Sequence, residues 1–127
     1  MRLLALSLFA FVLSIAGTAS AQSPGSYAQR ASPYGGAVTL RAYYYASDTC
    51  QAALSGKRGA PAGQAVPKNY IPVTIVIGPN PKGCGDSRLV TRLMTVSGPS
   101  IVSTIRIFFV NTSGRILKIE NVSMPFT

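Results

Sequence analysis

Apolar and polar residues alternate along several short stretches of this chain. In residues 38–46, the even-numbered positions hold valine, leucine, alanine and tyrosine, while the odd-numbered positions include threonine and arginine. Residues 70–77 have isoleucine or valine at every second position, and in residues 88–96 Val90 and Met94 share one side of an extended chain. A two-residue period is typical of a β-strand with one buried face. We therefore predict a strand in each of these three segments.

The C-terminal part of the chain predicts a β-hairpin. Two apolar segments, residues 101–110 and 115–122, flank the sequence Asn-Thr-Ser-Gly at positions 111–114. These four residues suit a type I turn followed by Gly114 in the left-handed conformation, the usual three-residue hairpin connection.

This turn sets the register of the hairpin and therefore its two faces. The predicted register begins with Val110 opposite Ile116 and continues without interruption. One face then carries only apolar side chains, namely Ile105, Ile107, Phe109, Leu117 and Ile119. A shift by one residue would move a strand's apolar set to the opposite face. We therefore expect this register, with Phe108 on the less buried face.

The segments without a two-residue period are predicted to form other elements. Residues 22–36 are rich in Ser, Pro and Gly and are expected to be a flexible tail. Asp48 can cap one helical turn over residues 50–54, and residues 55–69 are expected to form a long surface loop. Pro72 has no N–H for a ladder hydrogen bond, so we expect its strand at a sheet edge, at least where the strand begins.

Residues 1–21 have the features of a secretory signal peptide. Arg2 precedes an apolar segment over residues 3–15, and Ala-Ser-Ala at positions 19–21 fits a cleavage site. The apolar segment is shorter than the roughly 20 residues needed to span a membrane. We therefore predict export to the periplasm or the extracellular space and cleavage before Gln22. The domains are then the tail, residues 22–36, and a single β domain, residues 37–127.

No segment after the signal shows a sustained helical period. The predicted fold is all-β, a small antiparallel β-sandwich or partly closed barrel with a C-terminal β-hairpin. The two cysteines, Cys50 and Cys84, are expected to form a disulfide, because exported pairs normally join in an oxidising compartment. In the chain-entropy model this bond would stabilise the fold by roughly 3–4 kcal/mol.

The chain is strongly basic, with twelve Lys and Arg against three Asp and Glu and a net charge of +9. Removing Arg2 with the signal leaves a charge of about +8, carried by basic residues that are scattered singly apart from Lys57-Arg58. Such a charge favours an anionic partner: an anionic polymer, a lipid surface or an acidic protein. The alternative is that the charge only keeps a small domain soluble.

Several catalytic chemistries are excluded by composition. The chain has no histidine, which removes the commonest general base and zinc ligand. With only three acidic residues, a glycosidase that needs two carboxylates across one cleft is difficult to build. A Ser–Lys hydrolase is the least supported alternative, because no spacing singles out a pair. Asp48 and Asp86 each lie two residues from a cysteine and could form a weak calcium site. Capping and turn roles explain them better, so no metal, cofactor or catalytic residue is predicted.

A candidate binding surface lies on the first predicted strand. Tyr43 and Tyr45 share a face with Arg41, and aromatic rings beside a cation can stack sugars or bases. Tyrosine is also a common strand residue with no binding role. With Lys57 and Arg58 these residues form the predicted binding set, with Tyr27, Tyr34 and Tyr70 as further candidates nearby. We expect an exported, non-catalytic module that binds an anionic partner, or alternatively a secreted enzyme inhibitor that uses the 55–69 loop.

Overall fold

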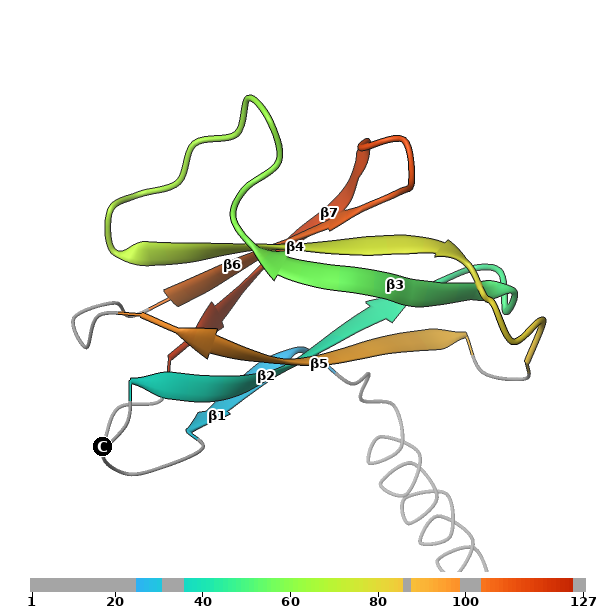
Figure 1. The fold of residues 1–127 in the computed structure, drawn as a ribbon, viewed down its shortest axis with the longest axis horizontal. Coiled ribbons are helices and arrows are strands. Elements are labelled where there is room, and N and C mark those ends of the chain that lie inside the picture. The colour runs from blue at the N-terminus through green and yellow to red at the C-terminus, as the bar shows by residue number, and fades with distance from the viewer. Residues whose placement is uncertain (1–24, 31–35, 86–87, 99–103, 125–127) are drawn as a thin grey trace, which may run out of the picture.

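The computed structural model of the 127-residue chain describes residues 25–30, 36–85, 88–98 and 104–124. Two facing sheets make up an open β-sandwich, which confirms the predicted all-β fold; neither sheet closes into a barrel (Figure 1). One sheet has the strand order β1-β2-β5 and the other β3-β4-β6-β7. The strands are β1 (Tyr27–Arg30), β2 (Ala37–Tyr45), β3 (Gln51–Arg58), β4 (Tyr70–Pro79), β5 (Leu89–Ser97), β6 (Thr104–Val110) and β7 (Ile116–Ser123).

The neighbouring strands of each sheet pair antiparallel as predicted, except β4 and β6, which run parallel. The chain passes from β4 to β5 in the opposite sheet before it returns as β6 (Figure 1). Because β5 runs back along the length of the sandwich in the opposite sheet, β6 starts at the same end of its sheet as β4 and runs parallel to it.

The core lies between the two sheets and follows the predicted alternation. The ring of Tyr44 packs against that of Phe109, with centroids 5.4 Å apart. The largest contributions come from three strands, with every side chain no more than 2% exposed: Val38, Leu40 and Ala42 in β2, Ile71, Val73, Ile75 and Ile77 in β4, and Ile105, Ile107 and Phe109 in β6.

Cys50 and Cys84 form the predicted disulfide, which joins two connections 34 residues apart in the sequence. It ties the chain just before β3 to the connection between β4 and β5. Such a bond fits an oxidising, extracellular compartment. Among the described residues, no helix is long and apolar enough to cross a membrane.

The helical turn predicted over residues 50–54 is wrong, because Gln51–Arg58 forms strand β3. The Asp48 carboxylate accepts a hydrogen bond from the Cys50 N–H at 2.9 Å, but this turn precedes a strand instead of a helix. β3 pairs with β4 along its length, with a bulge between Ala53 and Ser55. Sheet pairing therefore overrides a weak local helix signal, and the connection to β4 shortens from residues 55–69 to 59–69.

β4 lies inside the four-stranded sheet, between β3 and β6, so the predicted edge position is wrong for most of the strand and correct only where it begins. Pro72 lies beyond the last residue pair of β3, Arg58 with Val73. Its carbonyl accepts a hydrogen bond from Gly59 N–H at 2.8 Å. Because Pro72 has no N–H, it cannot donate a ladder hydrogen bond to the Gly59 carbonyl. That carbonyl accepts a hydrogen bond from the Thr74 hydroxyl instead, at 2.7 Å. The missing N–H is therefore compensated where β3 ends.

Part of the predicted flexible tail is ordered as strand β1. Tyr27–Arg30 pairs antiparallel with β2, and Ser26 just before it bonds to Glu120 in β7. The tail prediction is therefore wrong for these residues. The segment has no apolar period of its own, but it forms a strand because β2 offers it backbone hydrogen bonds. Residues 22–24 and 31–35 lie outside the described residues.

The hairpin turn forms as predicted, with Gly114 at φ +89°. The Gly114 N–H donates to the Asn111 carbonyl at 3.0 Å. The Asn111 side-chain oxygen accepts from the N–H groups of Ser113 and Arg115, at 3.1 and 2.9 Å. This asparagine therefore organises the whole connection between β6 and β7.

The predicted register of the hairpin is wrong beyond its first pair. Val110 lies opposite Ile116, but the next pair is Phe109 with Lys118. Leu117 is the extra residue of a β-bulge in β7. Every later residue of β7 is therefore displaced by one position relative to β6.

The bulge changes which residues of β7 enter the core. It places Val122 opposite Ile105, and Val122 and Met124 are each 7% exposed. The uninterrupted register would have placed Asn121 opposite Ile105. Burying an amide without a hydrogen bond costs about 1–3 kcal/mol. The bulge avoids this cost, because it places Val122 instead of Asn121 at the core position opposite Ile105.

The face assignments of the hairpin are only partly confirmed. Leu117 and Ile119, predicted in the core, are 39% and 47% exposed, whereas Phe108, predicted on the less buried face, is 1% exposed. Phe108 pairs with Thr74 on the outer face of the four-stranded sheet. The connection formed by residues 59–69 lies on this side of the sheet (Figure 1). Three of the five predicted core residues are confirmed: Ile105, Ile107 and Phe109.

Candidate functional site

The outer face of the three-stranded sheet groups large exposed side chains. Tyr27, Tyr45 and Leu93 are 45%, 69% and 53% exposed, and Arg41 and Tyr43 lie beside them, half-buried. We call these five residues the tyrosine face. Exposed apolar side chains that are grouped, and not scattered singly, mark interaction surfaces.

Three strands build the tyrosine face. Their register places Tyr27 of β1 and Leu93 of β5 on either side of Arg41 in β2. Tyr43 and Tyr45 follow at every second position along β2, in steps of about 6.6 Å. As predicted, Arg41 and the two tyrosines of β2 share one face. Tyr27, predicted to lie nearby although it falls in the segment predicted as a tail, does join this face, whereas the local pattern of the sequence does not place Leu93 on it.

The edge of the tyrosine face is fixed by a chain of hydrogen bonds to the other sheet. The Tyr43 N–H donates to the Ser26 hydroxyl oxygen at 3.0 Å. Ser26 in turn donates from its N–H and its hydroxyl to the two carboxylate oxygens of Glu120, at 3.1 and 3.0 Å. Lys118 lies 3.7 Å from the same carboxylate. Glu120 therefore holds the start of β1 against β7.

Tyr27, Arg41 and Tyr43 interact through their polar ends. The rings of Tyr27 and Tyr43 have centroids 6.1 Å apart. Burial raises the pKa of the Tyr43 phenol above its ordinary value, and the hydrogen bond and charge of Tyr27 raise it further. Arg41 lowers the pKa of Tyr43 in part, because a cation favours the phenolate.

We expect Tyr43 to ionise at a higher pH than an ordinary tyrosine. A raised pKa means that the folded state holds this proton more tightly than the unfolded state. The associated stability is present below the ordinary tyrosine pKa and is lost as the pH rises through the folded value. Ultraviolet absorbance during alkaline titration measures tyrosinate, and Tyr43→Phe should remove a late-titrating group. The expectation fails if Tyr43→Phe removes a group that titrates at the ordinary value.

Lys57 and Arg58 lie away from the tyrosine face, which separates them from the rest of the predicted binding set. Lys57 pairs with Thr74 on the four-stranded sheet. Arg58 donates from Nη1 to the Ser97 carbonyl in β5 and so closes one end of the sandwich. Tyr70, predicted to lie near the aromatic residues, is also on the four-stranded sheet, where Arg106 lies 4.8 Å above its ring. Tyr34 lies outside the described residues.

A groove of about 480 Å³ crosses the outer face of the four-stranded sheet. Its walls are residues 60–62 and the hairpin turn, residues 111–114. Thr74, Val76 and Val110 form its floor, and Lys57 is the charged residue among those that line it. Polar and apolar residues both line the groove, and none of them is acidic, so it provides no paired acid and base for catalysis.

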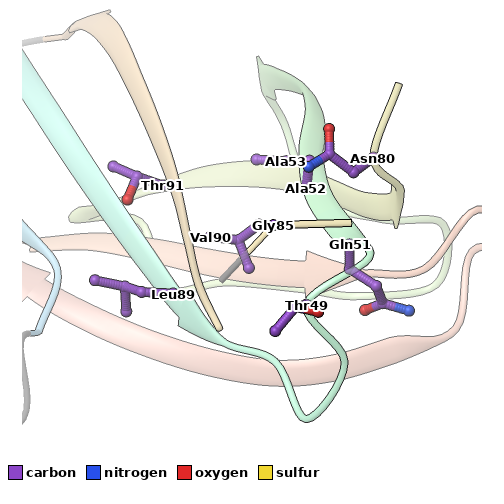
Figure 2. A pocket seen from close by; sticks show the side chains of 9 residues that line it. All are labelled: Thr49, Gln51, Ala52, Ala53, Asn80, Gly85, Leu89, Val90 and Thr91. Atoms are coloured by element: carbon purple, nitrogen blue, oxygen red, sulfur yellow. The ribbon is translucent and has the colours of Figure 1, made fainter. Parts of the chain in front are cut away.

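A second hollow, of about 350 Å³, lies between the edges of β3 and β5, and its lining includes Thr49 and Gly85, the neighbours in sequence of the two disulfide cysteines (Figure 2). Neutral polar and apolar residues line it: Thr49, Gln51, Ala52, Ala53, Asn80, Gly85, Leu89, Val90 and Thr91. No charged side chain is among them, so this hollow offers nothing for an anionic partner.

The described residues contain no group of three or more His, Cys, Asp or Glu side chains able to hold a metal ion. Asp48 is engaged by the Cys50 N–H, and Asp86 lies outside the described residues.

Comparisons of this chain with protein-family models, curated proteins and solved structures found no match.

Proposed function

We propose that this protein is an exported, non-catalytic binding module that uses the tyrosine face to bind an acidic polysaccharide. The observation that carries the proposal is the grouping of Tyr27, Tyr45 and Leu93, each 45% exposed or more, around Arg41. Tyrosine combines an apolar ring with a hydroxyl, which suits the C–H faces and hydroxyl groups of sugars.

The charge of the surface favours a polysaccharide over other anionic polymers. Arg41 is the one cation of the tyrosine face. A nucleic acid strand carries a phosphate about every 3.4 Å along the duplex axis and calls for several cations in a row. A lipid surface likewise needs several, because each contributes only about 1 kcal/mol. A polysaccharide presents the C–H faces of its sugar rings beside each acidic group, which matches one arginine among aromatic rings.

The remaining charge supports the proposal at longer range. The sequence has nine more basic than acidic residues, and a field of this sign speeds encounter with an anionic partner. The absence of histidine from the sequence and the use of both cysteines in a disulfide support a non-catalytic role. Export rests on the signal sequence and is supported by the same disulfide.

We expect the exported protein to bind polygalacturonate or dextran sulfate but not neutral dextran, and to lose affinity as salt rises. Tyr45→Ala should weaken binding by about tenfold, the scale of one aromatic stacking contact. Ile119→Ala, which removes a similarly exposed apolar side chain from the opposite sheet, is the matched control. Affinity electrophoresis and isothermal titration calorimetry provide the measurements.

Three results would contradict the proposal. The first is equal binding by the wild type and Tyr45→Ala. The second is binding to anionic vesicles but to no acidic polysaccharide. The third is stoichiometric capture of one protein that persists at high salt, which would instead support an inhibitor.

A further inference from the structure

Three hydrogen-bonding side chains meet at one end of the tyrosine face. Tyr27 and Arg41 are direct partners across β1 and β2, and Tyr43 lies two residues further along β2. The ring centroids of Tyr27 and Tyr43 are 6.1 Å apart. A guanidinium and two phenolic hydroxyls therefore share a small area of a solvent-facing sheet.

Arg41 and Tyr27 act on the Tyr43 phenol in opposite senses, since Tyr27 raises the pKa of Tyr43 and Arg41 lowers it. Both side chains are therefore close enough to the phenol to affect its ionisation. A guanidinium carries five N–H donors and each phenol one O–H donor, so the cluster is rich in hydrogen-bond donors.

The acidic residues of the described chain are engaged elsewhere. Both oxygens of Glu120 accept hydrogen bonds from Ser26. Asp48 accepts one from the Cys50 N–H. Neither carboxylate forms an ion pair with Arg41, since the ion pair of the described residues joins Lys118 to Glu120. The donors of this cluster are therefore not matched by an acid within the described residues.

We propose that Tyr27, Arg41 and Tyr43 form an oxyanion subsite that holds the acidic group of the bound polysaccharide. The guanidinium forms charge-assisted hydrogen bonds to two oxygens of the anion, and the Tyr27 hydroxyl donates a further one. Tyr45 and Leu93 then contact the sugar rings on either side. This inference rests on the proposed function and adds the group that is recognised, a sugar carboxylate or a sulfate ester.

The test separates arginine geometry from charge. Arg41→Lys keeps the charge but loses the two-pronged donor, and should weaken binding to an acidic polysaccharide about tenfold. Tyr27→Phe removes one hydroxyl and should weaken it about threefold. Arg115→Lys in the hairpin turn and Tyr70→Phe on the other sheet are the matched controls and should bind like the wild type. Thermal melts verify that all four variants fold.

Polygalacturonate and dextran sulfate distinguish the carboxylate from the sulfate as the group recognised. Sodium sulfate alone, at constant ionic strength, provides a separate probe of the subsite by chemical-shift changes at Tyr27 and Arg41. Such changes without polysaccharide binding would support the subsite and overturn the proposed function. Polysaccharide binding that survives Arg41→Lys and Tyr27→Phe would overturn the subsite and leave the proposed function standing. If the protein shows neither chemical-shift changes with sulfate nor binding to an acidic polysaccharide, both the subsite and the proposed function are overturned.

Discussion

Phe109→Ala should destabilise this protein by about 3–5 kcal/mol, because it removes a ring from the middle of the core. Phe109 is 1% exposed, lies between the two sheets and packs against the ring of Tyr44. Small domains have a total stability of only about 5–15 kcal/mol, so the variant should unfold at a much lower denaturant concentration or fail to accumulate. Urea unfolding followed by circular dichroism measures the difference.

Phe108→Ala should also be costly, since this ring is 1% exposed on the outer face of the four-stranded sheet. The matched control is Ile119→Ala, directly opposite Phe108 in β7 but 47% exposed. We expect it to change stability by less than about 1 kcal/mol. If Ile119→Ala proved as damaging as Phe109→Ala, the uninterrupted register would be right and the bulge at Leu117 would be wrong.

Reduction of the disulfide should lower the unfolding free energy by about 3–4 kcal/mol, the chain-entropy value for a loop of this length. The bond joins Cys50 to Cys84, 34 residues apart, and therefore restricts a large part of the unfolded chain. Urea unfolding with and without a thiol reductant measures the effect, and mass spectrometry of the exported protein verifies the bond.

The control for the disulfide is the double variant Cys50→Ala, Cys84→Ala. It should resemble the reduced wild type in stability and show no response to reductant. A wild-type midpoint that does not move on reduction would contradict the expected stabilisation. Free thiols in most of the exported protein would contradict the disulfide itself.

The alternation of apolar and polar residues is enough to locate the strands that bury one face. Alternation identified β2, β4 and β5, because a pleated strand points successive side chains to opposite sides. It also fixed the shared face of Arg41, Tyr43 and Tyr45, which follows from position alone. The turn before β7 was equally local, since Asn111 and Gly114 provide its hydrogen bonds and its positive φ.

The candidate site could be predicted only in part, because neighbouring strands come from distant segments. Tyr27 joins the tyrosine face only when β1 pairs with β2, and that pairing is held by Glu120, 94 residues from Ser26. Leu93 joins it through the pairing of β5 with β2. Lys57 and Arg58 are adjacent in sequence to each other, yet they serve different parts of the sandwich.

The register of the hairpin and the positions of the weak strands depend on packing between distant segments. Periodicity alone favoured Leu117 and Ile119 as core residues, but the complete sheet gains more by turning Val122 and Met124 inward and leaving Asn121 in solvent. Pro72 could occupy a central strand because β3 ends beside it. Both features depend on how much surface whole strands bury and on contacts between residues far apart in the chain. A local sequence pattern carries no information on such contacts.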